Sequence, residues 1–224
     1  MKKLPSNLLN MVLSLGIITI VASSLLAWVN SLTAGPIEEA QQKEEIEAIK
    51  SVTPPFDNNP RSQEWKWIPD NDTIPFMVYP AMENGNLVGA AVKGYTKNGF
   101  GGEIRIMYGF STDGSVTGYQ VLSHAETPGL GAKMQEWFRM DIGNRSVIGK
   151  NPSATPMYVS KDTGGAIDGI TAATITSRAF LETLRDCFAA FEAYKTDHGF
   201  TATPSNIAGD CTTGATTHTS SKSE

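Results

Sequence analysis

The first pattern along the chain is a long apolar run near its N-terminus. No charged residue occurs between Lys3 and Glu38, and residues 8–32 are mainly Leu, Ile, Val, Ala and small side chains. This run exceeds the roughly 20 residues with which an α-helix crosses the hydrocarbon core of a membrane. Trp28, near its far end, suits the interface, where tryptophan is enriched. The pattern predicts one transmembrane helix over residues 8–32.

A cleaved signal peptide is the alternative interpretation of the same run. Its apolar part is usually only about 7–15 residues long and ends at a small-x-small site. The run here is longer, and Trp28 and Asn30 stand where cleavage is expected, so an uncleaved anchor is favoured. Because Lys2 and Lys3 precede the helix, the positive-inside rule predicts that residues 1–7 are cytoplasmic. The soluble part then lies in the periplasm, with the anchor in the inner membrane of a Gram-negative cell.

Residues 33–72 are predicted to link the anchor to a soluble domain. Segment 36–51 is rich in Glu, Gln, Ala and Lys, which indicates a short helix leaving the membrane. The helix is expected to end at Thr53-Pro54-Pro55, because the residue before a proline disfavours helical backbone. A loop of turn-forming residues follows.

A pattern of short β-like runs begins at Thr73. The runs are separated by Asn-Gly and Asp-Gly signals, which are typical of turns between adjacent antiparallel strands. The predicted strands are 74–79, 87–95, 103–110 and 116–123. The glycine-rich segment 99–102 lacks the spacing of a nucleotide loop and is interpreted as a hairpin connection. A short helix over 133–139 and a strand over 157–160 are expected next.

The longest amphipathic helix of the soluble part follows residue 168. Its apolar positions recur at helical spacing: Phe180, Leu184, Cys187, Phe188 and Phe191. Because Ser and Thr oxygens cap first-turn N–H groups, the helix is predicted to begin near Thr176 or Ser177, with Thr174 just outside it. A hydroxyl at that place faces free amides and the positive end of the helix dipole, which suits a phosphate. Residues 200–224 are rich in Thr, Ser and Ala and are predicted to be a disordered tail.

Composition narrows the possible functions. The net charge is −5 and no block of Lys or Arg occurs, so nucleic-acid binding is not supported. Cys187 and Cys211 do not form a disulfide framework and lack metal-ligand spacing, and a bond between the two stays open. His124, His198 and His218 have no acids or thiols at ligand spacing, so no metal site is predicted.

Two motifs carry a resemblance to a known family. Segment 168–177, Asp-Gly-Ile-Thr-Ala-Ala-Thr-Ile-Thr-Ser, resembles the flavinylation motif of the FMN-binding subunits of Rnf and Na⁺-translocating Nqr complexes. In that family a flavin transferase moves FMN from FAD onto the threonine after the Ala, as a phosphoester, which by position is Thr174. The family more often has Ser-Gly where this chain has Thr171-Ala172. Segment 124–131, His-Ala-Glu-Thr-Pro-Gly-Leu-Gly, resembles the other signature of the family.

The resemblance covers the apolar N-terminal segment and most of the chain to about residue 195, and is closest to the G subunit of Rnf, with the C subunit of Nqr as the alternative. It implies an α+β fold, in which a single N-terminal transmembrane helix precedes one FMN-binding domain (residues 73–199) with an antiparallel sheet and packed helices. The implied FMN-binding residues are Thr174 as the covalent site, Thr171, Ala173, Glu126, Thr127, Leu130, Gly131 and Asp168. Backbone amides and Thr127 would bond the flavin while Leu130 packs on its ring. For Asp168 two roles stay open: capping amides of the turn, or meeting the transferase's metal during loading.

The implied function is that of an electron-carrying subunit with covalent FMN. In Rnf complexes electron transfer between ferredoxin and NAD is coupled to ion translocation, so the expected partners are the other subunits, the membrane and the flavin transferase. No catalytic residue is predicted, and the anchor has no intramembrane charge with which to conduct ions. The alternatives are a stand-alone anchored flavoprotein reductase, disfavoured because no substrate domain is recognisable, and an assembly module without redox function, disfavoured because Thr174 and its small neighbours are intact.

Overall fold

The computed structural model describes residues 8–69 and 74–200. The predicted cytoplasmic segment 1–7, most of the predicted tail, and Cys211 and His218 within it lie outside the described residues.

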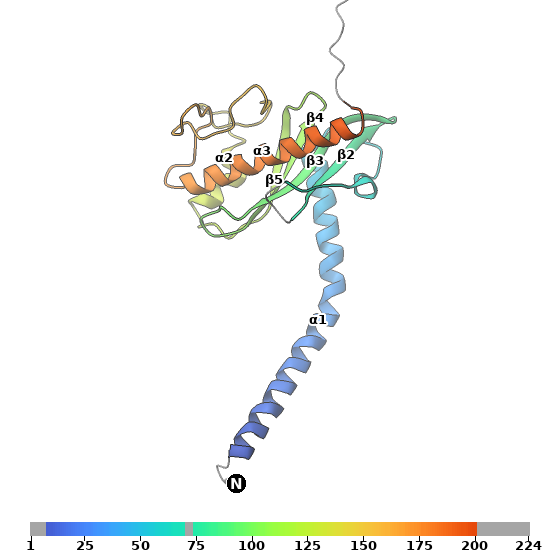
Figure 1. Cartoon of the computed structure of the whole chain (residues 1–224), viewed down its shortest axis with the longest axis vertical. Helices are drawn as coiled ribbons and strands as arrows, with labels where there is room; N and C mark the ends of the chain where they lie inside the picture. Colours follow the sequence, from blue (N-terminus) through green and yellow to red (C-terminus); the bar gives the residue numbers. More distant parts are fainter. Residues whose placement is uncertain (1–7, 70–73, 201–224) are drawn as a thin grey trace, which may run out of the picture.

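Helix α1 (Leu8–Val52) is a single element of 45 residues. Residues 36–51 are helical as predicted, but they continue the apolar helix without a break, with Pro36 inside α1. A proline removes one helical hydrogen bond and bends a helix, and α1 changes direction part-way along its length (Figure 1). The predicted end is confirmed: α1 stops at Val52, and the Thr53 hydroxyl donates to the Ile49 carbonyl at 2.7 Å.

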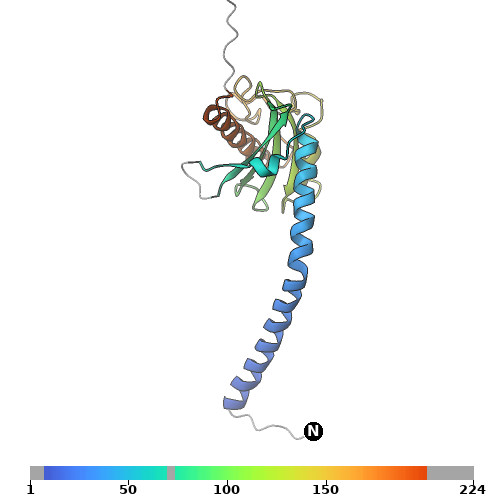
Figure 2. The ribbon, with the colours of Figure 1, turned by 90° about the vertical axis from the view of Figure 1, so that its right-hand side faces the viewer.

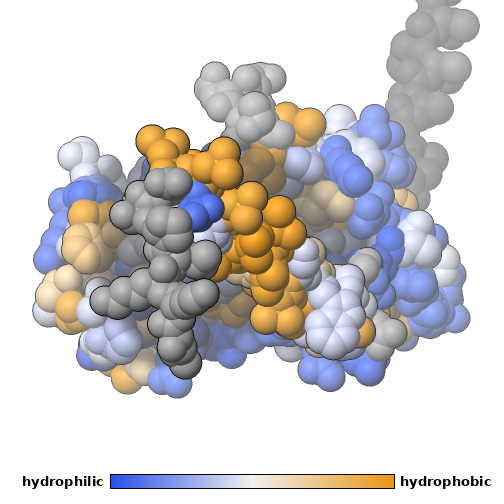
Figure 3. Space-filling model, turned by 90° about the horizontal axis from the view of Figure 1, so that it is seen from below, coloured by the Kyte–Doolittle hydropathy of each residue, from blue (hydrophilic) through white to orange (hydrophobic). Residues whose placement is uncertain are grey.

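The N-terminal part of α1 is long and apolar enough to cross a membrane, and its most apolar window has no residue buried against the protein. Seen from below, its apolar side chains stand in front of a domain surface on which hydrophilic residues predominate (Figure 3). Exposed leucine, isoleucine and valine along a helix of this length are compatible with the hydrocarbon core of a membrane.

The soluble domain is built on a five-stranded antiparallel sheet with strand order β1-β2-β3-β4-β5. The strands are β1 (Trp65–Trp67), β2 (Phe76–Glu83), β3 (Asn86–Thr96), β4 (Ile104–Ser111) and β5 (Val116–Ser123). The predicted meander is thus confirmed, with β1 as an additional edge strand. Asn84 and Gly85 have φ of 50° and 80°, the left-handed backbone that the tight β2–β3 turn requires.

Two predicted elements differ from the structure. The strand over 157–160 is wrong, since Val159 forms only an isolated bridge to Ile167. The helix over 133–139 is shorter and follows a 3₁₀ turn: η2 spans Gly131–Lys133 and α2 spans Met134–Trp137. A further 3₁₀ turn, η1 (Pro60–Gln63), precedes β1.

The sheet lies between two helices (Figures 1 and 2). Helix α3 (Thr174–Asp197) covers one face, where Phe180 packs edge-on against Tyr108 and Phe191 stacks on Phe110. The last turns of α1 cover the other face in a smaller cluster of buried residues: Ala48, Ile49, Val52, Tyr79, Ala91 and Met107.

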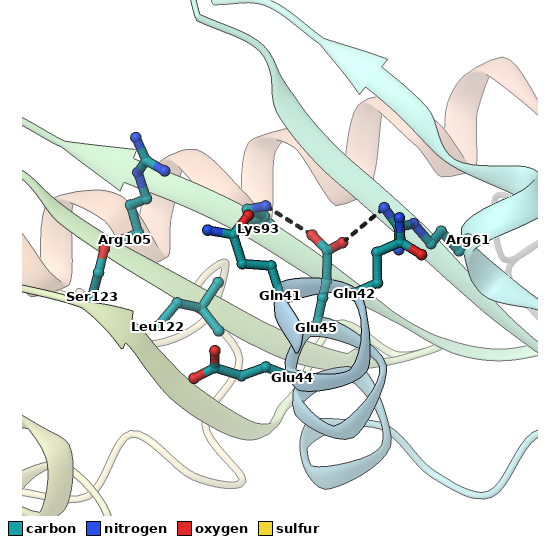
Figure 4. A pocket seen from close by; sticks show the side chains of 9 residues that line it. All are labelled: Gln41, Gln42, Glu44, Glu45, Arg61, Lys93, Arg105, Leu122 and Ser123. Carbon is teal, nitrogen blue, oxygen red and sulfur yellow. Dashed lines mark hydrogen bonds and ion pairs between the residues drawn. The ribbon is translucent and has the colours of Figure 1, made fainter. Parts of the chain in front are cut away.

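A polar network reinforces the contact between α1 and the sheet. Glu45 of α1 reaches Lys93 at 2.7 Å and Arg61 at 3.8 Å, beside a hollow of about 370 Å³ (Figure 4). The Tyr79 hydroxyl donates to Glu45 at 2.9 Å. Burial opposes ionisation of Glu45, but the hydrogen bonds from Lys93 and Tyr79 and the nearby cations outweigh it and lower the pKa of the carboxyl. The soluble domain is therefore packed onto the C-terminal part of α1.

Candidate functional site

The turn that leads into α3 is held by one buried serine. The Ser177 hydroxyl accepts a hydrogen bond from the Ile170 amide at 2.8 Å and donates to the Ala173 carbonyl at 2.9 Å. The predicted helix start is wrong: α3 begins at Thr174, two to three residues before Thr176 or Ser177. Ser177 lies inside the first turn and reaches back to the preceding loop, whereas the prediction placed a capping hydroxyl at the helix end.

Ala172 has a φ of 63°, in the left-handed region. This conformation costs a residue with a Cβ about 1–2 kcal/mol. Ala172 is also the position at which the resembling family more often has glycine, the residue for which this backbone is free of strain. The turn reverses the chain there and presents Thr174 at the first position of the helix.

The N-terminus of α3 is uncapped. Its N-cap, Ala173, offers no side-chain hydrogen bond. Among the described residues, the amides of Thr174, Ile175 and Thr176 have no hydrogen-bond acceptor, and the Thr174 hydroxyl has no partner either. Free first-turn amides and the helix dipole attract anions. A hydroxyl thus stands beside a set of donors suited to a phosphate.

A cavity of about 290 Å³ opens at this point. Six of the eight predicted site residues line it: Glu126, Thr127, Leu130, Gly131, Ala173 and Thr174. The other two do not. Thr171 is exposed and lies outside the lining. Asp168 uses its carboxylate on the Asn144 amide at 3.0 Å and the Ser160 hydroxyl at 3.1 Å.

Asp168 thus supports the neighbouring loop. Its backbone carbonyl also accepts a hydrogen bond from Trp137 Nε1 at 2.8 Å. Of the two roles left open, the structure shows amide binding, but to Asn144 and not to the turn before α3.

Four further residues line the cavity that were not among the predicted site residues: Phe100, Ala172, Ile175 and Thr176. Phe100 is 69% exposed and Ile175 is 51% exposed, although both are large and apolar. Ile175 lies outside the apolar stripe of α3, and this was the one feature of the sequence that could have indicated its place in the cavity lining. Phe100 lies in the glycine-rich connection between β3 and β4, and only the fold brings it to α3.

Of the described residues that line the cavity, Glu126 alone is charged, and it is 5% exposed. It accepts hydrogen bonds from the Gly101 amide at 2.9 Å and from the Thr176 hydroxyl at 2.6 Å. His124, two residues earlier, accepts a hydrogen bond from the Glu126 amide through Nδ1 at 3.2 Å. Cys187 is buried elsewhere on α3, and burial raises the pKa of its thiol.

The cavity suits a phosphorylated cofactor with a flat apolar group. Comparison with known proteins identifies the class of domain to which this site belongs. Residues 99–189 match the model of the FMN-binding domain, so the soluble part is an FMN-binding domain. Residues 1–52 match the RnfG N-terminal region. Strands β1, β2 and β3 lie between the two matched ranges.

Similar proteins cover most of the chain. The chain is 32% identical to the G subunit of the ion-translocating oxidoreductase complex of Shewanella piezotolerans, over 82% of this chain and 89% of the relative. It is also 32% identical to the G subunits of the complexes from Cereibacter sphaeroides (83% of this chain, 84% of the relative) and Vibrio cholerae (75% and 82%). The chain belongs to the family of G subunits of ion-translocating oxidoreductase complexes. The predicted Rnf resemblance and the predicted α+β fold are both confirmed.

Proposed function

We propose that this chain carries FMN as a phosphoester on Thr174 and serves as an electron-carrying subunit of a membrane-bound, Rnf-type ion-translocating complex. One observation carries the proposal: the Thr174 hydroxyl, free of partners among the described residues, stands at an uncapped helix start and lines the cavity. Family membership supports the assignment to such a complex, because the relatives are named as subunits of an ion-translocating oxidoreductase complex.

The surrounding residues fit an FMN attached at this point. The phosphate would meet the unpaired amides of Thr174, Ile175 and Thr176, where the helix dipole favours negative charge. The exposed apolar side chains of Phe100, Leu130 and Ile175 offer packing surface to a flat ring. When bound, the isoalloxazine ring supplies the redox chemistry, and the protein supplies position and polarity.

The partners and location follow from the same proposal. A flavin transferase loads Thr174, and the remaining subunits donate and accept electrons between ferredoxin and NAD and translocate the ion. The soluble domain faces the periplasm and α1 spans the inner membrane, with Lys2 and Lys3 on the cytoplasmic side. A covalent link there keeps the flavin from dissociating into the periplasm.

The direct test is to produce the full chain with its flavin transferase and to measure the intact mass. The wild type should gain the mass of one FMN phosphoester, and peptide mapping should assign it to Thr174. Thr174→Ala should remain folded and colourless, since a residue at a helix start contributes only about 0.5–2 kcal/mol even as a cap. Thr196→Ala, an exposed threonine at the other end of α3 and outside both the motif and the cavity lining, is the control and should load fully. An adduct on any other residue contradicts the assignment.

A turnover assay of the isolated chain distinguishes an electron relay from an enzyme that acts by itself. The flavin-loaded full chain in detergent should be reduced by dithionite and show negligible oxidation of NADH or ferredoxin by itself. Turnover near an ordinary enzyme rate, about 10 s⁻¹, would point to a stand-alone reductase. The orientation is tested by a reporter active only in the periplasm, fused to the C-terminus; activity of a cytoplasmic reporter there would reverse the assignment.

A further inference from the structure

Glu126 connects three segments that are far apart in sequence. It belongs to the loop after β5, its Oε1 accepts the amide of Gly101 from the β3–β4 connection, and its Oε2 accepts the hydroxyl of Thr176 from α3. Each of these segments contributes residues to the wall of the same cavity. The carboxylate therefore fixes the distances between the walls.

The backbone around this carboxylate is closely fitted. A Cβ on Gly131 would collide with Glu126 Oε2 and lie 2.7 Å from Thr176 Oγ1. A Cβ on Gly99 would lie 2.7 Å from Glu126 Oε1. A side chain at either glycine would therefore have to displace the Glu126 carboxylate from its present position. The two glycines leave room for the carboxylate between the three segments.

The Glu126 carboxylate has no ion-pair partner in the described part of the chain. The other nine lining residues are uncharged. Each oxygen atom already accepts one hydrogen bond from the protein. Besides the hydrogen bonds that its remaining lone pairs can accept, Glu126 acts on a cofactor in the cavity through the field of its buried negative charge.

We infer that Glu126 is a positioning residue that holds the cavity walls together and lowers the reduction potential of the flavin. The inference rests on the proposed function. Each electron that the ring accepts from a donor adds one negative charge, until a proton taken up from solvent neutralises it. The Glu126 carboxylate repels that added charge and so disfavours the reduced form relative to the oxidised one.

Two variants separate the charge from the hydrogen bonds. Glu126→Gln keeps the shape: the amide oxygen can accept from Gly101, and the amide nitrogen can donate to Thr176 Oγ1. Thr176→Val, the matched control, removes one hydrogen bond and keeps the charge. The measurement is spectroelectrochemical titration of the flavin-loaded full chain, together with thermal melting of the unloaded chain.

Glu126→Gln should shift the equilibrium toward reduced flavin on the order of tenfold, about 59 mV upward for a one-electron couple. Thr176→Val should leave the potential unchanged or lower it, because it removes a donor that stabilises the carboxylate. In the unloaded chain Glu126→Ala should melt well below Glu126→Gln, since it releases both donors.

The outcomes distinguish the two proposals. An unchanged or lowered potential in Glu126→Gln overturns the inference while the flavin stays on Thr174. Equal melting of Glu126→Ala and Glu126→Gln overturns the positioning role. A wild-type chain that gains no FMN overturns the proposed function, and with it the electrostatic effect on the flavin.

Discussion

The Ser177 hydroxyl offers the sharpest test of how the candidate site is held. Ser177 is fully buried, and its Oγ is the acceptor for the Ile170 amide, which is buried as well. Ser177→Ala removes the acceptor and leaves that N–H unpaired away from water. An unsatisfied buried donor costs about 1–3 kcal/mol. For a chain of this size, that loss lowers the melting temperature by about 2–12 °C.

The matched control is Thr183→Val, further along α3. Thr183 is also fully buried, but its hydroxyl only donates to the Ala179 carbonyl at 2.8 Å, an oxygen within the helical ladder. Valine keeps the shape and leaves no donor unpaired, so this change should be close to neutral. The assay is thermal unfolding of the full-length protein in detergent, followed by circular dichroism, with hydrogen exchange at Ile170 as a local readout. Equal melting temperatures for the two variants, with unchanged protection of Ile170, would refute the reasoning.

Two further predictions concern the contact between α1 and the sheet. The pKa of Glu45 is lowered in the folded protein, so its stabilising effect is present above the ordinary pKa of 4.5 and is lost as the pH falls through the folded pKa. In chemical denaturation, the difference in unfolding free energy between wild type and Glu45→Gln should therefore shrink in acid. A difference that stays constant with pH would contradict this. Gly109→Ala should destabilise the protein strongly, because the new Cβ would collide with the Val52 carbonyl. Gly118→Ala, whose Cβ would lie 3.2 Å from Val52 Cα, should destabilise it much less. The measurement is the midpoint of urea unfolding, and equal midpoints would argue against close packing of α1 at Gly109.

The features predicted correctly from sequence are those that short-range patterns determine. The apolar run of α1 and the four main strands of the meander depend on neighbouring residues and on turns such as Asn84-Gly85. β1 is different: its three residues hold an edge position by pairing with β2, and Trp67 packs edge-on against Phe76. Such a short strand is defined by its partner, so its own sequence gives little sign of it.

The candidate site likewise combines residues that sequence motifs indicate with residues that only the fold brings together. The two motifs contain most of the cavity lining, but Phe100 reaches it from the β3–β4 connection, which the sequence presents as an ordinary glycine-rich turn. The start of α3 was misplaced because Ser177 resembles a capping residue in sequence and in fact bonds a loop amide seven residues earlier. Both errors concern contacts between segments that only the folded chain brings together.

The docking of α1 on the sheet leads to a last prediction. Ile49 is 1% exposed and packs in the cluster with Tyr79, Ala91 and Met107, whereas Ile46, three residues earlier on the same helix, is 38% exposed. Ile49→Ala deletes buried carbon atoms and leaves a cavity, at a cost of about 2–5 kcal/mol. Ile46→Ala makes the same chemical change at a half-exposed position and should cost about 0.5 kcal/mol or less.

If the domain is fixed to its membrane helix by this cluster, the two variants must differ in more than stability. Ile49→Ala should loosen the end of α1 and make residues 53–58, which follow it, more sensitive to a protease. The turn before α3, on the opposite face of the sheet, should stay intact. Ile46→Ala should show the wild-type cleavage pattern. The experiment is limited proteolysis of the full-length protein in detergent, with the melting temperature measured on the same samples. Equal melting and equal cleavage of the two variants would mean that the end of α1 is not packed against the sheet.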